Sequence, residues 1–185
     1  MDDAEVEDYT ERLQAKRTEK DDFFAEHPQS PVPPEHREDF EGLNYFPADP
    51  EYRVSATVEV HDDPDPVEMA TSDGRTVRYE RVATFAFELD GEPTRLHGYR
   101  QDAGADEPVF VPFRDKTTGQ ETYADGRYME LAVEGELEDG AEVTLDFNLA
   151  YSPFCAYSET FSCPLPPEEN WLETTVEAGE RTPEM

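Results

Sequence analysis

The sequence predicts a mainly β fold, an antiparallel β-barrel or sandwich preceded by an N-terminal α-helix. From residue 52 onward, apolar and polar side chains alternate with the period of two that half-buried strands require. Short runs of β-type residues then follow one another, separated by turn signals such as Asp90-Gly91 and Asp139-Gly140. Residues 4–26 carry apolar side chains at helical spacing instead. The length of 185 residues suits one domain with an appended terminal segment.

The chain divides into an N-terminal segment, residues 1–30, and a β domain, residues 31–185. The helix expected over residues 4–26 begins after Asp2 or Asp3, either of which can cap it. Its narrow apolar stripe predicts packing against the β domain or against a partner. Four prolines between residues 28 and 34 exclude helix there and favour an extended connector.

About eight to ten short strands are expected in the β domain. The Asp- and Pro-rich run 62–66 should end the first of them. Such short strands at regular spacing are typical of an antiparallel sandwich or barrel and not of alternating βαβ units. The expected strands cover residues 52–60, 67–70, 75–80, 82–89, 94–100, 108–113, 120–124, 127–134, 141–148 and 171–177.

The charge limits the possible partners. With 46 acidic and 15 basic residues the formal net charge is −31, so nucleic acid and anionic membrane surfaces would be repelled. Only three of the basic residues are Lys, and an acidic, Lys-poor surface is typical of proteins from salt-accumulating halophiles. The sequence contains no apolar stretch long enough to span a bilayer and no signal-peptide pattern, so we expect a cytoplasmic protein.

Residues 71–128 contain 11 acidic and 8 basic side chains and are close to neutral, unlike the rest of the chain. The predicted ligand-binding site therefore centres on the loop between residues 113 and 128. Guanidinium groups there supply charge-assisted donors and tyrosines supply walls. The alternative is two consecutive hairpins whose Asp and Thr side chains satisfy their own turns. The predicted binding residues are Arg114, Asp115, Tyr123, Arg127, Tyr128 and Asn148.

No established catalytic motif occurs in the sequence. His97, on a predicted strand, and Asp146, at the end of another, are the candidate catalytic bases. Cys155 and Cys163 are the only cysteines, and we expect free thiols. They are weak candidates for a metal site, because the histidines show no paired ligand spacing. No particular cofactor is indicated.

Several short motifs resemble an uncharacterised family known as domain of unknown function 1684. They include Leu43-Asn44-Tyr45-Phe46-Pro47, Gly126-Arg127-Tyr128, Leu145-Asp146-Phe147-Asn148 and Ala178-Gly179-Glu180. The resemblance implies a mainly β domain preceded by a helix, in a halophilic archaeal-type member, and brings no established activity. Leu149 and Ser152 depart from the pattern, which argues against anion binding by that turn itself.

The sequence thus predicts a binding module for a small polar or carboxylate-bearing molecule. One alternative is an enzyme, a hydrolase for example, with Asp146 or His97 as base. Another is an interaction protein that docks a partner through its N-terminal helix. The oligomeric state is left open.

Overall fold

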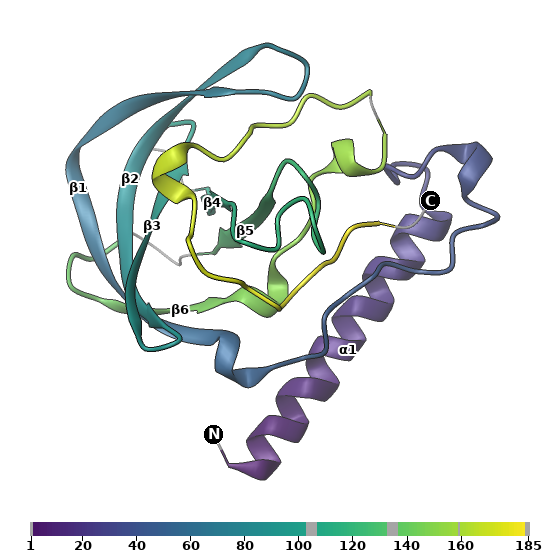
Figure 1. Ribbon diagram of the computed structural model, residues 1–185, viewed down its shortest axis with the longest axis horizontal. Coiled ribbons are helices and arrows are strands. Elements are labelled where there is room, and N and C mark those ends of the chain that lie inside the picture. The colour runs from purple at the N-terminus through teal and green to yellow at the C-terminus, as the bar shows by residue number, and fades with distance from the viewer. Residues whose placement is uncertain (1, 103–106, 133–136, 159, 184–185) are drawn as a thin grey trace.

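The computed structural model describes residues 2–102, 107–132, 137–158 and 160–183. One long helix, α1 (Asp3–Glu26), precedes a single six-stranded antiparallel sheet (Figure 1). The strands are β1 (Arg53–Ala70), β2 (Thr76–Leu89), β3 (Glu92–Arg100), β4 (Val109–Phe113), β5 (Arg127–Leu131) and β6 (Glu142–Asp146), in the spatial order β5-β4-β3-β2-β1-β6. The predicted mainly β architecture with a leading helix is confirmed, as one curled sheet in the form of a half-barrel.

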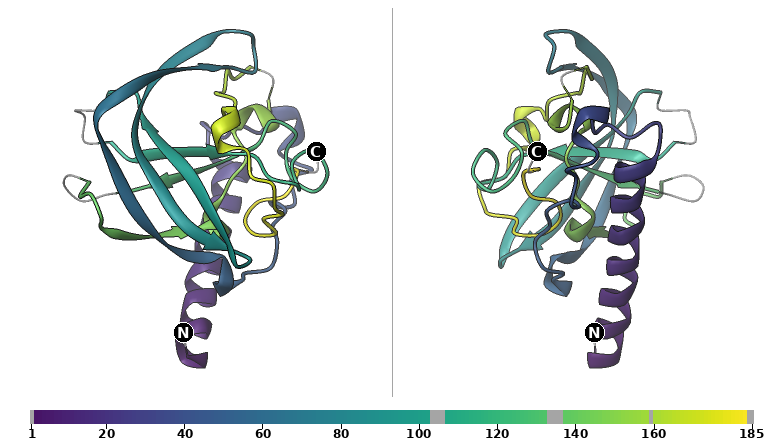
Figure 2. Two further views of the ribbon diagram at one scale, coloured as in Figure 1. Left: turned by 60° about the vertical axis from the view of Figure 1, so that its left-hand side comes forward. Right: turned by 90° about the vertical axis from the view of Figure 1, so that its right-hand side faces the viewer.

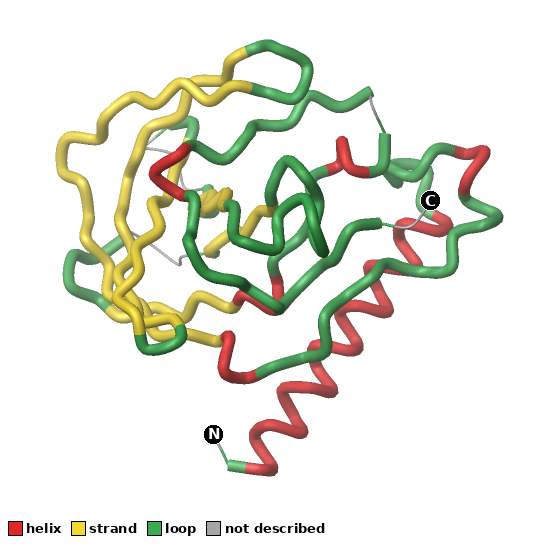
Figure 3. The backbone as a smooth tube through the Cα atoms, viewed as in Figure 1, coloured by secondary structure: helices red, strands yellow, loops and turns green. Residues whose placement is uncertain are grey.

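The core lies on the concave face of this sheet, which curls around the loop after β4 and the C-terminal segment (Figures 2 and 3). Alternate side chains of the strands point into it, as the period of two requires. Residues after β6 close the core from the other side. The members contributed by the chain after β6 are Phe147, Ala150, Val176 and Ala178, packed on strand residues such as Phe85, Leu96, Val111 and Phe113.

The acidic, proline-rich run does not break the first strand, contrary to the prediction. β1 continues from Arg53 to Ala70, and its register against β2 shifts between Val60 and Asp65. The run lies beyond Thr57, where the pairing of β1 with β6 ends, so its prolines sit on an unpaired edge at a bulge. The runs predicted at 75–80 and 82–89 likewise form one strand, β2, whose register against β3 shifts between Arg81 and Ala83.

Two predicted strands are absent from the part of the chain that the structure describes. Residues 120–124 form turns, because Asp115 and the nearby threonine hydroxyls bond to local groups in place of a ladder. Residues 171–177 are irregular, although Leu172 N donates to Arg114 O and brings this segment alongside the loop. The strand expected over 127–134 is β5 to residue 131, and its residues 133 and 134 lie outside the described ranges.

Helix α1 begins as predicted and packs against its own β domain. Asp2 caps it in a reciprocal capping box with Glu5, and Pro28 follows its end closely. Its buried positions are Tyr9, Leu13, Arg17 and Phe24. None of the described helices is long and apolar enough to cross a membrane.

Candidate functional site

The predicted site residues Asp115 and Arg127 meet, but as a closed structural pair. Arg127 is the first residue of β5 and is fully buried. Its Nη2 lies 3.5 Å from Asp115 Oδ1 and donates to Val176 O, while Nη1 donates to Ala178 O and Glu180 O. Burial lowers the pKa of Arg127, and the carboxylate of Asp115 opposes that shift. Its terminal nitrogens are therefore committed to the protein itself.

The carboxylate of Asp115, the partner of Arg127 in this pair, is also bonded to other groups of the protein. Asp115 accepts hydrogen bonds from the Thr117 hydroxyl and, at 2.6 Å, from Val176 N. We call Asp115, Arg127 and residues 176–180 the C-terminal clasp. It holds the irregular end of the chain against β5, and Gly179 passes so close to Ala150 O that a Cβ there would lie 2.6 Å from that oxygen. This close approach explains a glycine with a φ of +81°.

Asp146 and Asn148 are also hydrogen-bonded to each other, next to the N-terminal half of helix α1. Asn148 Nδ2 donates to Asp146 Oδ1 at 3.0 Å and to Asp49 O at 2.7 Å. The Tyr9 hydroxyl donates to Asp146 Oδ2 at 2.7 Å, and Arg53 pairs with the same carboxylate. This arrangement fastens the helix and the segment before β1 to the end of β6. Both carboxylate oxygens of Asp146, the predicted base, thus already accept hydrogen bonds from other residues of the protein.

The remaining predicted binding residues lie apart from these two groups. Arg114 stacks over the exposed Trp171 ring, with its Cζ 4.8 Å from the ring centroid. The Tyr123 hydroxyl donates to Asp125 at 3.2 Å. Tyr128 is buried beside Phe110, and it is the one member of the predicted set that lines the aromatic pocket described below.

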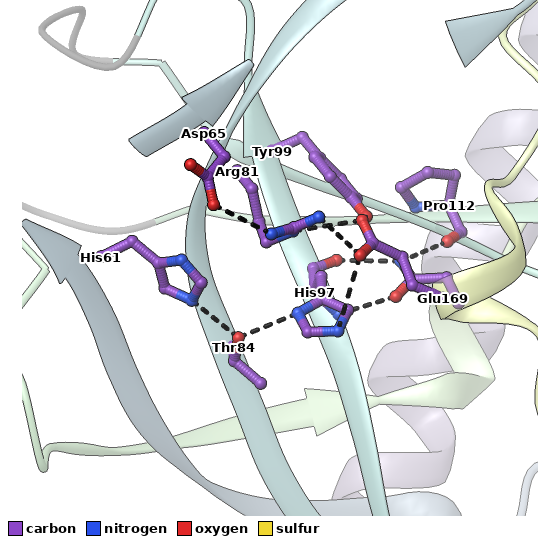
Figure 4. Close-up of polar contacts among 9 residues, drawn as sticks. His61, Asp65, Arg81, Thr84, His97, Tyr99, Pro112 and Glu169 are labelled. Atoms are coloured by element: carbon purple, nitrogen blue, oxygen red, sulfur yellow. Dashed lines mark hydrogen bonds and ion pairs between the residues drawn. The ribbon is translucent and has the colours of Figure 1, made fainter. Parts of the chain in front are cut away.

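His97 belongs to a chain of polar contacts on β1, β2 and β3 (Figure 4). The Thr84 hydroxyl lies 2.9 Å from His97 Nδ1 and 2.8 Å from His61 Nε2. His97 Nε2 is 4.0 Å from Glu169, whose carboxylate binds Arg81 through both oxygens, at 3.1 and 2.6 Å. Burial lowers the pKa of His97, with Glu169 acting in the opposite direction.

This polar chain is tied to the sheet where β3 and β4 separate. β3 pairs with β4 only at Tyr99 and Phe110. Beyond that point the buried Asn170 fills the gap, since its Nδ2 donates to His97 O and Pro112 O and its Oδ1 accepts from His97 N. The candidate base His97 is therefore held rigidly by its backbone.

The two cysteines are free thiols. Cys163 is buried, and burial together with the neighbouring Cys155 raises its pKa to about 12. Within the described ranges, no group of three or more His, Cys, Asp or Glu side chains has an arrangement that could hold a metal ion.

A pocket of about 340 Å³ lies near the ends of β3 and β4, within the usual size range for small-molecule sites of roughly 300–1,000 Å³. We call it the aromatic pocket. Neighbouring ring centroids are 5.5 Å apart for Tyr79 and Phe110, 4.7 Å for Phe110 and Tyr128, and 5.8 Å for Tyr128 and Tyr151. The lining residues are Tyr79, Tyr99, Arg100, Gln101, Glu107, Pro108, Phe110, Tyr128, Glu130, Tyr151 and Pro164.

Three tyrosine hydroxyls in this lining are already fixed by the protein. Tyr151 donates to Glu130 at 2.7 Å, Tyr128 donates to Pro164 O, and Tyr99 donates to Glu169. Burial is the largest cause that raises the pKa of all three tyrosines, so they stay neutral at ordinary pH. The rings are thus held in place as walls.

Arg100, the last residue of β3, differs from the other lining residues. The residue is only 8% exposed, yet its Nε and Nη2 find no hydrogen-bond partner among the described parts of the chain. A buried donor without a partner is costly, by roughly 1–3 kcal/mol and more for a charged group. Arg100 therefore keeps hydrogen-bonding capacity that no described residue of the chain uses.

Sequence reasoning did not select Arg100, Tyr79, Phe110 or Tyr151. The signal available was weak: Arg100 belongs to the near-neutral stretch 71–128, but a strand arginine usually pairs across the sheet in solvent. The pocket joins β2, β3, β4, β5 and the chain after β6, and no local motif reveals such a combination.

Comparison with known proteins places the sequence among uncharacterised relatives. The model of a family described as "Protein of unknown function (DUF1684)" matches residues 38–181. No curated protein matches the sequence. The solution NMR structure of an uncharacterized protein from Haloarcula marismortui is similar over 98% of both chains, with 65% identity and a TM-score of 0.76. This relative supports a halophilic archaeal origin.

Proposed function

Because the chain belongs to the DUF1684 family, whose description assigns no activity, we propose a function from its own geometry: it binds a small carboxylate-bearing molecule in the aromatic pocket. The observation that carries the proposal is Arg100, a buried guanidinium with two unpartnered nitrogens in the lining of a pocket of about 340 Å³. A ligand carboxylate would supply the missing acceptors through charge-assisted hydrogen bonds.

The walls favour a ligand with a flat apolar body. Phe110 contacts both Tyr79 and Tyr128, and such aromatic rings bind other rings by offset stacking or edge-on contact. Glu107 and Glu130 also line the pocket, so its rim repels anions that lack a group able to reach Arg100. We propose that this combination selects small monocarboxylates over polyanions.

The pocket residues replace most of the set predicted from sequence. Arg127 and Asp115 hold the C-terminal clasp, and Asn148 holds the helix to the β domain. Of the predicted residues, Tyr128 supports binding here as a wall.

Benzoate is a suitable probe, since it combines a carboxylate with one aromatic ring. Isothermal titration calorimetry in high KCl should give saturable benzoate binding. Benzamide lacks the charge, so its affinity should be lower by about tenfold or more. Arg100→Met should weaken benzoate binding by about tenfold or more, because a charged hydrogen bond is lost.

Arg114→Met is the matched control. Arg114 is also an arginine in the near-neutral stretch, but it stacks on Trp171 and does not line the aromatic pocket. Its replacement should leave benzoate binding unchanged. Binding that is lost with Arg114→Met and kept with Arg100→Met would contradict the aromatic pocket and favour the site predicted from sequence.

A further inference from the structure

Another buried arginine, Arg17, also has two nitrogens without a partner among the described residues, and it does not line the aromatic pocket. It is on helix α1 and is 8% exposed. Its Nη1 donates to Phe46 O at 3.0 Å, and its guanidinium lies over the Tyr45 ring, 4.3 Å from the centroid. Its Nε and Nη2, and the buried Tyr45 hydroxyl, have no hydrogen-bond partner among the described residues.

The residues that carry these groups, Arg17 and Tyr45, line a small cavity between α1 and the β domain. Its volume is about 70 Å³, too small for most organic ligands but sufficient for a monatomic ion with a water molecule, since one water needs roughly 10–15 Å³. The lining residues are Leu13, Lys16, Arg17, Lys20, Tyr45, Asn148, Leu149, Ala150 and Glu180.

The charge around this cavity is unusual for the molecule. Three of the 15 basic residues of the chain, Lys16, Arg17 and Lys20, line it together with one acidic residue, Glu180. Glu180 is already occupied, because its carboxylate accepts from Lys20, from the Tyr157 hydroxyl at 2.9 Å and from Ser152 N at 3.2 Å. The cavity therefore keeps a positive excess in a protein with a net charge of −31.

From this geometry we propose that the cavity is a binding site for a small monatomic anion, of which chloride is the type. Arg17 Nε and Nη2 and the Tyr45 hydroxyl are the donors, and Leu13, Leu149 and Ala150 provide apolar walls that strengthen the electrostatic attraction. Leu149 contributes only a wall, so the donors come from the helix and from the segment before β1, and not from the turn after β6.

Binding here would stabilise the contact between α1 and the rest of the chain. The donors lie on the helix and on the segment before β1, so an anion would hold these two parts of the chain together beside the chain after β6. An ion that binds only the folded state raises its stability in proportion to the logarithm of its concentration above Kd. The proposal is independent of the function of the aromatic pocket.

The test replaces potassium gluconate by KCl at constant potassium concentration, since gluconate is a monovalent organic anion much larger than a monatomic ion and keeps the ionic strength constant. The wild type should broaden the ³⁵Cl NMR line, and the excess line width should fall as added chloride exceeds the number of sites. The melting temperature should rise steadily with the logarithm of the chloride concentration. Arg17→Met should weaken this chloride binding by about tenfold or more. Tyr45→Phe, which removes only the hydroxyl, should weaken it by a smaller factor and serves where Arg17→Met does not fold.

Arg12→Met is the matched control, because Arg12 is on the same helix and pairs with Asp8 in solvent, outside this cavity. It removes the same charge and should leave chloride binding as in the wild type. The proposal is overturned if the wild type shows no chloride-specific change, which would mean that water fills the cavity. It is also overturned if Tyr45→Phe and Arg17→Met behave as Arg12→Met does.

Discussion

Arg127 and Arg100 occupy comparable places in the sheet but have opposite surroundings. One begins β5, the other ends β3, and both are buried. The terminal nitrogens of Arg127 bind three carbonyls and face Asp115, leaving only its Nε unpartnered, whereas Nε and Nη2 of Arg100 are both unpartnered. Burial alone therefore does not distinguish a structural arginine from a binding one. The distinction lies in whether the chain itself supplies the acceptors.

The largest expected difference between the two arginines is in stability. Arg127→Met leaves Asp115 buried without its cation, and breaking such a pair from one side costs about 3–5 kcal/mol. Arg100→Met removes a buried charge with two unpartnered nitrogens, so the free energy of unfolding should stay the same or increase by roughly 1–3 kcal/mol. Urea titrations at constant high KCl measure both values.

Equal losses in the two variants would break the comparison, because Arg100 would then be held by the folded chain as Arg127 is. A second measurement separates the roles further. Benzoate should raise the melting temperature of folded Arg127 variants such as Arg127→Lys, but not of Arg100→Met.

The comparison also shows what could be read from the sequence. The alternation at residues 53–60, the capping residue Asp2 and the turn at Asp90-Gly91 are local signals, and the structure follows them. The motifs Gly126-Arg127-Tyr128 and Ala178-Gly179-Glu180 stood out as shared family features. The contact between these two motifs in the C-terminal clasp explains why both occur. The spacing of the motifs in the sequence does not reveal that contact.

Where the prediction of the fold was wrong, side chains competed with the backbone ladder. The threonine-rich run 117–122 has β propensity, but Asp115 and the Thr118 hydroxyl bond to each other and to nearby backbone groups, which favours turns. The run 62–66 looked like a strand end because prolines exclude central strands, yet an edge strand tolerates them. Edge position depends on the complete sheet order and cannot be read locally.

Salt provides the next, more general test. The surface carries most of the −31 charge, so its self-repulsion is screened as salt rises, and we expect the melting temperature to increase from 0.1 to 3 M KCl. The Arg127–Asp115 pair is fully buried, and buried pairs are screened much less. The stability difference between the wild type and Arg127→Met should therefore stay nearly constant while both melting temperatures rise. Circular dichroism at each KCl concentration checks this, and an unchanged wild-type melting temperature would contradict the halophilic interpretation.

The smallest expected effect concerns His97. Its backbone is fixed by hydrogen bonds, as Arg127 is, but its ring can still change its protonation state. Burial lowers its pKa in the folded state, and Arg81, His61 and Arg95 act in the same direction, against Glu169. The unfolded chain then binds more protons near and below the ordinary histidine pKa of about 6.5, so stability falls as the pH decreases through that value.

The melting temperature of the wild type should consequently decrease more between pH 7 and pH 5 than that of His97→Gln. His36→Gln is the matched control, since His36 is exposed and its loss should leave the wild-type pH dependence unchanged. A steeper decrease in His97→Gln than in the wild type would mean that Glu169 outweighs burial and holds His97 protonated. In that case His97 would be a charged partner of Glu169, and the neutral imidazole needed for a base at this position would not form near pH 7.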